Sequence, residues 1–183
     1  MQPRPSLMKK TFILLLFFGI VFSLLLLPIL VLEVRVDGSE ELVFQQPAKA
    51  GSLFEVHWIH SVTLQPVIEV YLLEAPGRIP IVKMTFDEFG PNLPAHPEFN
   101  QYWVIEDGKY NVLGYDLVFE RVPVTIGAVI ADHTLVYNGR STPLKDVYRP
   151  GGYVHIGLAE KKLCQFFIEE VEIWQKGRKM TAF

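Results

Sequence analysis

Three residues capable of acid–base or nucleophilic chemistry, His60, Ser61 and Glu69, lie close together in this 183-residue chain. Apolar and polar side chains alternate over residues 54–62 and again over residues 67–73, as they do in the two strands of a β-hairpin. If the residues between these stretches form the turn, His60 lies directly opposite Glu69 on a mostly apolar face. The sequence therefore predicts a cross-strand imidazole–carboxylate pair that fixes the register of the hairpin.

The geometry of this group argues against a catalytic role. Consecutive residues of a strand point to opposite faces, so Ser61 would point away from His60 and Glu69, and no G-x-S-x-G pattern occurs. The histidines are scattered without an H-E-x-x-H pattern, and a single cysteine excludes a paired-cysteine metal site. We therefore predict no catalytic residue, no metal site and no cofactor. The alternative is a small-ligand-binding or metal-dependent enzyme that uses His60, Glu69 and His96.

An irregular segment, residues 87–100, is the second candidate for a functional role. Its three prolines and one glycine exclude regular secondary structure, and its length is typical of binding loops and lids. We expect this loop and the hairpin to form a surface that recognises another protein or a small ligand. The candidate binding residues are His60, Ser61, Glu69, Phe89, Gly90, Leu93 and Pro94.

The elements that would position these residues follow a membrane segment. Residues 11–32 carry no charge, and as a helix they would span about 33 Å, enough for a hydrocarbon core of about 30 Å. Basic residues precede the segment and acidic residues dominate after it, so the positive-inside rule places the N-terminus in the cytoplasm. A cleaved signal peptide is the alternative, but the exit shows no A-x-A cleavage pattern. We predict cytoplasmic residues 1–10, a single transmembrane anchor at 11–32 in the cell membrane, and an extracytoplasmic domain at 33–183.

The external domain is predicted to be mainly β. Near the C-terminus, over residues 162–175, the apolar spacing changes to three and four, which favours a short amphipathic helix over a further strand. Asp-Gly and Asn-Gly pairs mark tight hairpin turns. The expected fold is an antiparallel β-sandwich or a partly open barrel with a C-terminal helix. Besides the hairpin, strands are expected at 42–46, 79–86, 101–106, 109–113, 122–131, 134–137 and 153–159.

Composition limits the possible partners. The net charge of −3 comes without a basic stripe, so nucleic acid is not an expected partner. Cys164 is the only cysteine, so the domain contains no internal disulfide and must rely on its hydrophobic core. The first expected partner is the lipid bilayer, through residues 11–32.

Five short motifs follow one another along the external domain. They are His60-Ser61-Val62, Pro66-Val67-Ile68-Glu69-Val70-Tyr71, Phe86-Asp87-Glu88-Phe89-Gly90 with Leu93-Pro94, Glu106-Asp107-Gly108-Lys109-Tyr110, and residues 126–135. With them the chain resembles a bacterial family known as a domain of unknown function, serial number 1850, over residues 34–175. The chain departs from the family at Asn92, where the family usually has a second glycine before Leu-Pro.

The resemblance implies a small exported or membrane-anchored protein, and it brings no enzymatic activity or catalytic residue. Such proteins are often encoded beside, or fused to, subunits of TRAP transporters of the type with a TAXI substrate-binding protein. We therefore expect a membrane-anchored extracytoplasmic accessory or interaction domain that associates with subunits of such a transporter. A structural envelope protein is the third hypothesis.

Overall fold

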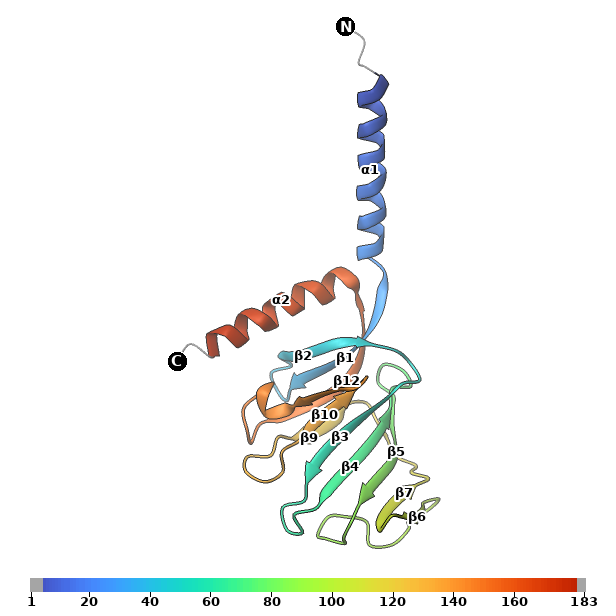
Figure 1. Cartoon of the computed structure of the whole chain (residues 1–183), viewed down its shortest axis with the longest axis vertical. Helices are drawn as coiled ribbons and strands as arrows, with labels where there is room; N and C mark the ends of the chain where they lie inside the picture. The colour runs from blue at the N-terminus through green and yellow to red at the C-terminus, as the bar shows by residue number, and fades with distance from the viewer. Residues whose placement is uncertain (1–4, 181–183) are drawn as a thin grey trace. The chain divides into compact units, whose positions relative to one another are not determined.

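The computed structural model describes residues 5–180, and the chain divides into two compact units. One unit consists of Met1–Ile29 and Glu160–Phe183, and it contains helices α1 (Pro5–Leu25) and α2 (Leu163–Met180). The other unit, Leu30–Ala159, contains the β-domain, and Figure 1 labels most of its strands. The candidate binding residues all belong to this second unit.

Four strands form the smaller sheet, in the order β2 (Leu42–Ala48), β1 (Pro28–Val36), β12 (Tyr153–Lys162) and β9 (Val122–Thr125). β2 runs antiparallel to β1, and β9 runs antiparallel to β12. Burial alternates along β9, where the two valines are buried and Pro123 and Thr125 are exposed. One face of this sheet is therefore directed at the core.

Eight strands form the larger sheet, and every pairing in its described part is antiparallel. The short strand β8 (Val118–Phe119) pairs with the start of β5, and a 3-10 helix, Leu144–Asp146, follows β11. The other strands lie in the order β11 (Arg140–Pro143), β10 (Thr134–Tyr137), β3 (Leu53–Ile59), β4 (Pro66–Leu72), β5 (Ile79–Phe86), β7 (Lys109–Leu113) and β6 (Tyr102–Glu106).

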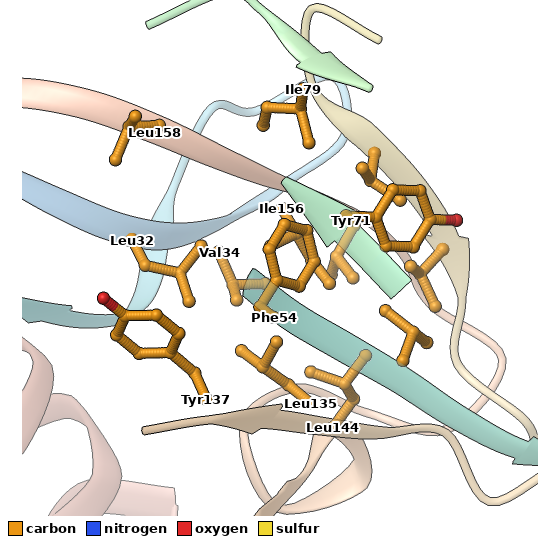
Figure 2. Packing of buried hydrophobic residues seen from close by; sticks show 14 of the residues in the cluster. Leu32, Val34, Phe54, Tyr71, Ile79, Leu135, Tyr137, Leu144, Ile156 and Leu158 are labelled. Atoms are coloured by element: carbon orange, nitrogen blue, oxygen red, sulfur yellow. The ribbon is translucent and has the colours of Figure 1, made fainter. Parts of the chain in front are cut away.

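The two sheets share one hydrophobic core, and neither sheet closes into a barrel. The smaller sheet contributes Leu32 and Ile156, and the larger sheet contributes Phe54, Tyr71 and Leu135 (Figure 2). Because side chains alternate along a strand, each strand directs only every second residue into this core. The mainly β, antiparallel architecture expected from the sequence is confirmed.

Two predicted hairpin turns form with left-handed backbone at both central residues. Asp107 and Gly108, with φ angles of 51° and 76°, join β6 to β7, and Asn138 and Gly139, with φ angles of 50° and 74°, join β10 to β11. Turns of this kind match the twist of the strands they connect, and they require residues that tolerate positive φ. Asp-Gly and Asn-Gly meet that requirement, so local sequence sets the register of both hairpins.

The helix predicted at residues 11–32 ends earlier than expected. Helix α1 ends at Leu25, and residues 28–32 belong to β1, where Val31 and Leu32 are fully buried. Pro28 cannot continue a helical hydrogen-bond pattern, and a run of Ile, Leu and Val suits a buried strand as well as a helix. Among the residues that the structure describes, no helix is both long enough and apolar enough to cross a membrane.

The C-terminal helix predicted at residues 162–175 is confirmed, as α2 (Leu163–Met180). The strand predicted at 122–131 is wrong beyond Thr125. The chain folds back after that residue, and Gly127 lies so close to the backbone of Ala131 that no side chain would fit there. An apolar run rich in β-branched residues thus forms a strand only in its first part, because backbone packing overrides its strand propensity.

Candidate functional site

His60 lies in the turn between β3 and β4, because β3 already ends at Ile59. Its backbone N–H donates to the Gln65 carbonyl oxygen at 2.9 Å, and its own carbonyl oxygen accepts from the Leu64 N–H at 2.8 Å. The imidazole is turned inward, and the residue is only 4% exposed. A six-residue turn, 60–65, therefore holds a buried histidine at its start.

The imidazole of His60 connects this turn to the 87–100 loop. Its Nδ1 accepts from the backbone N–H groups of Thr63, at 3.1 Å, and Val62, at 3.3 Å. Since Nδ1 is an acceptor, the ring proton lies on Nε2, which donates to the Pro91 carbonyl oxygen at 2.9 Å. One neutral imidazole thereby satisfies three backbone groups from two segments of the chain.

Two backbone features let the loop approach the ring so closely. A Cβ atom at Gly90 would lie 2.7 Å from Cε1 and 2.9 Å from Nε2 of His60, so glycine alone fits without displacing the imidazole. Asn92 has a φ of 66°, in the left-handed region that glycine and asparagine tolerate best. This conformation explains why asparagine can stand where the family resemblance leads one to expect glycine.

The predicted His60–Glu69 pair does not form. In the observed register Glu69 faces Val56, and Trp58 faces Val67. Pro66 pairs with Ile59, so the turn is longer than the predicted 63–66 and the strands meet with a different offset. The hairpin is confirmed, whereas its predicted register is wrong.

Glu69 instead belongs to a buried polar group on the inward face of the larger sheet. The Tyr71 hydroxyl donates to Oε2 of Glu69 at 2.8 Å, and the Trp58 side chain also hydrogen-bonds to the carboxylate. Burial raises the pKa of Glu69 above its usual range, and these two hydrogen bonds only partly oppose that effect. Burial and the nearby Glu69 carboxylate also raise the pKa of the Tyr115 phenol.

Replacing Glu69 with glutamine should change how stability depends on pH. A carboxyl whose pKa is raised on folding binds its proton more tightly in the folded chain, so stability falls as pH rises from about 4.5 through the folded-state pKa. The Glu69→Gln variant has no carboxyl group to ionise, so it does not lose stability in this way as pH rises. Urea denaturation of the full chain should therefore show the variant gaining stability relative to the wild type across this window. Parallel pH profiles would contradict the buried, poorly solvated state of Glu69.

His133 packs against the same buried polar group through its contact with Trp58. Its ring stacks on Trp58, with 5.9 Å between ring centroids and 19° between planes. Burial lowers the pKa of His133. Its Nδ1 lies 2.9 Å from the Ala131 carbonyl oxygen and 3.1 Å from the Gly127 nitrogen, and its tautomer decides which bond forms. The ring therefore joins the irregular 126–133 segment to β3.

Phe89 anchors the 87–100 loop in an aromatic cluster. Its ring stacks on Trp103, with centroids 5.6 Å apart, and lies 4.6 Å from the Tyr110 ring. Phe86 contacts the same three rings from β5. Leu93 packs beside this cluster, and its N–H donates to the Gly90 carbonyl oxygen at 3.2 Å. Aromatic packing thus holds Phe89 and Leu93, and His60 holds the backbone between them.

The remaining candidates lie apart from this arrangement. Ser61 is exposed in the turn, Pro94 is half-buried, and His96 is exposed in the loop. Among the described residues, no three His, Cys, Asp or Glu side chains gather as a metal site would require. The structure therefore unites His60 with Gly90, beside Phe89 and Leu93, whereas Ser61 and His96 are exposed and Glu69 hydrogen-bonds to Tyr71 and Trp58.

Sequence reasoning missed five residues that build these two groups: Trp58, Trp103, Tyr110, Tyr115 and His133. Trp103 and Tyr110 flank the Asp-Gly turn, and their shared inward face could have been read from the hairpin register. No sequence signal joins His133 to Trp58, because the segment before β10 meets β3 only in the folded domain.

A family model with the description "Domain of unknown function (DUF1850)" matches residues 54–144. The matched stretch contains every candidate binding residue and nearly the whole larger sheet. It is shorter than the 34–175 over which the resemblance was expected. The comparisons with curated proteins and with solved structures found no match.

Proposed function

The chain belongs to the DUF1850 family through residues 54–144, and on that premise we propose that it is a membrane-anchored extracytoplasmic interaction domain. The observation that carries the proposal is the surface around His60, where a rigidly held loop displays exposed apolar side chains. We call this the loop surface and define it by Val62, Leu64, Phe89 and Ile105. The proposal assigns the protein a binding role and no catalytic step.

The parts of the loop surface are joined by contacts within the β-domain. Val62 and Leu64 lie in the turn that His60 ties to Pro91. Phe89 precedes Gly90, and Ile105 of β6 faces Tyr110, whose ring contacts Phe89. Each of the four side chains is about half exposed or more. Apolar residues that stay exposed while their backbone is held in place are typical of protein-binding sites.

An N-terminal anchor is supported by the apolar surface of α1. Its large side chains are exposed on all sides of the helix, and a helix that is apolar all round suits a lipid environment. Helix α1 ends at Leu25, and two further uncharged residues precede β1. If residues 11–27 were helical throughout in lipid, they would span about 25 Å, near the lower limit of about 17 residues for a crossing. Lys9 and Lys10 before it favour a cytoplasmic N-terminus and an external β-domain.

The proposed partner is a subunit of a TAXI-type TRAP secondary transporter. This part of the proposal comes from the family resemblance, in which such subunits are often encoded beside the family's members. The loop surface supplies a site of suitable chemistry, because a small rigid apolar patch with a polar surround is what a stable protein partner recognises.

Site-specific photo-crosslinking tests this function on the full chain in native membranes. A photoreactive amino acid at position 64 should crosslink to a transporter subunit, whereas the same group at position 129 should not. Val129 is the matched control because it is 90% exposed and belongs to the 126–133 segment, which contributes no residue to the loop surface as defined. Introducing a charge with Leu64→Asp should reduce capture of the partner at least tenfold, while Val129→Asp leaves it unchanged.

Equal crosslinking from positions 64 and 129, or none from position 64, would contradict the proposed binding role. A crosslink from position 64 to a protein other than a transporter subunit would retain the binding role and overturn the transporter assignment.

A further inference from the structure

One side of α2 carries large apolar side chains that remain exposed. Phe167, Ile168, Val171 and Trp174 are each more than half exposed. At 100° per residue, these positions fall within a sector about 120° wide. Phe166 lies outside that sector and is buried. The helix therefore has an apolar face that is distinct from the side that packs within the chain.

The rotation of α2 about its axis is fixed by an ion pair within its own unit. Lys161, just before the helix, places its Nζ 2.6 Å from Oε2 of Glu169. The Gln165 amide donates to the other carboxylate oxygen of Glu169 at 3.2 Å. Lys161 is buried, so this pair is shielded from solvent. With Glu169 held in this way, the side chains of the apolar sector remain exposed.

The start of α2 lies at the end of the apolar N-terminal stretch. The backbone N–H of Leu163 donates to the Leu27 carbonyl oxygen at 3.0 Å. Leu27 is the last residue before β1. If residues 11–27 cross the bilayer, this hydrogen bond sets the first turn of α2 at the level where the lipid headgroups begin.

Resting on the proposed anchor, we propose that α2 lies along the outer surface of the phospholipid bilayer. Phe167, Ile168 and Val171 then face the acyl chains, about 5–10 Å into the boundary between headgroups and chains. Lipid is the proposed binding partner of this face because the apolar face of α2 begins where the apolar surface of α1 ends. The helix sequence carries three acidic and three basic residues, so apolar burial holds it on zwitterionic phospholipid without a need for anionic lipid.

Spin labels on the full chain in phosphatidylcholine nanodiscs test this placement. Single cysteines are introduced by Val171→Cys on the apolar face and by Glu172→Cys on the neighbouring polar side, each in a Cys164→Ser background. Leu16→Cys, in the middle of α1, provides a reference for the bilayer interior. Collision rates with oxygen, which concentrates in lipid, and with a water-soluble nickel complex report the environment of each label.

We expect the label at position 171 to collide often with oxygen and rarely with the nickel complex, and the label at position 172 to show the reverse. A water-exposed label at 171 combined with a lipid-exposed label at 16 would overturn this inference and leave the anchor intact. Water-exposed labels at both 16 and 171 would overturn the anchor and, with it, the placement of α2.

Discussion

Replacing Phe54 with alanine is expected to lower the free energy of unfolding by about 3–5 kcal/mol. Phe54 is fully buried between the two sheets, and its ring stacks on Tyr71 with 5.1 Å between centroids and 16° between planes. The substitution removes the largest fully buried side chain of β3 from the core and leaves a cavity that neighbouring strands cannot readily fill. Urea denaturation of the full chain, followed by near-ultraviolet circular dichroism, measures the loss.

Leu53→Ala is the matched control for this prediction. Leu53 precedes Phe54 on the same strand, points to the opposite face and is 51% exposed. Its replacement should change stability by less than about 0.5 kcal/mol. Equal losses for the two variants would mean that the inward and outward faces of β3 are assigned incorrectly.

Replacing His60 with alanine should cost about 2–3 kcal/mol, because it leaves the Pro91 carbonyl and two N–H groups without the imidazole that satisfies them. The same variant should also loosen the loop, so the Leu93 amide, which donates to Gly90, should exchange its hydrogen faster. Denaturant unfolding and hydrogen exchange measure the two effects.

His96→Ala provides the comparison within the same loop region. His96 is exposed, so its loss should change stability by less than about 0.5 kcal/mol and leave the exchange of Leu93 unaltered. If the two histidine variants behave alike, His60 does not hold the loop.

The parts of the fold that local chemistry determines could be predicted from the sequence. Asp107-Gly108 and Asn138-Gly139 specify their turns because few other pairs adopt two positive φ angles. The change of apolar spacing after residue 162 specifies α2, since helix and strand differ in side-chain period. The antiparallel, mainly β architecture follows from such local signals.

The register of β3 and β4 could not be read in the same way. Residues 60–65 contain no Asn-Gly or Asp-Gly pair, so alternation alone left the length of the turn open. The buried His60, bonded to Pro91 in a distant segment, selects the longer turn. The predicted partner of His60 was therefore wrong, and the imidazole instead contacts the 87–100 loop through the Pro91 carbonyl oxygen.

Residues 28–32 illustrate a different limit. Their side chains suit lipid, a buried helix and a buried strand equally well, so hydrophobicity did not distinguish these environments. Pairing with β2 and packing of Leu32 in the shared core place them in the sheet. Glu69 was likewise misassigned. Its partner Tyr71 lies two residues along the same strand, whereas the approach of Trp58 from β3 depends on the register.

The central claim, that the His60 ring and the loop backbone at Gly90 are packed against each other, is tested most directly by a double-mutant cycle. Stability is measured for Gly90→Ala, His60→Ala and the double variant. In the wild-type background the added methyl group meets the imidazole and should cost about 1–3 kcal/mol. In the His60→Ala background most of that cost should disappear, giving a coupling energy of about 1 kcal/mol or more. A methyl group at position 90 that costs the same with and without the imidazole would contradict the account.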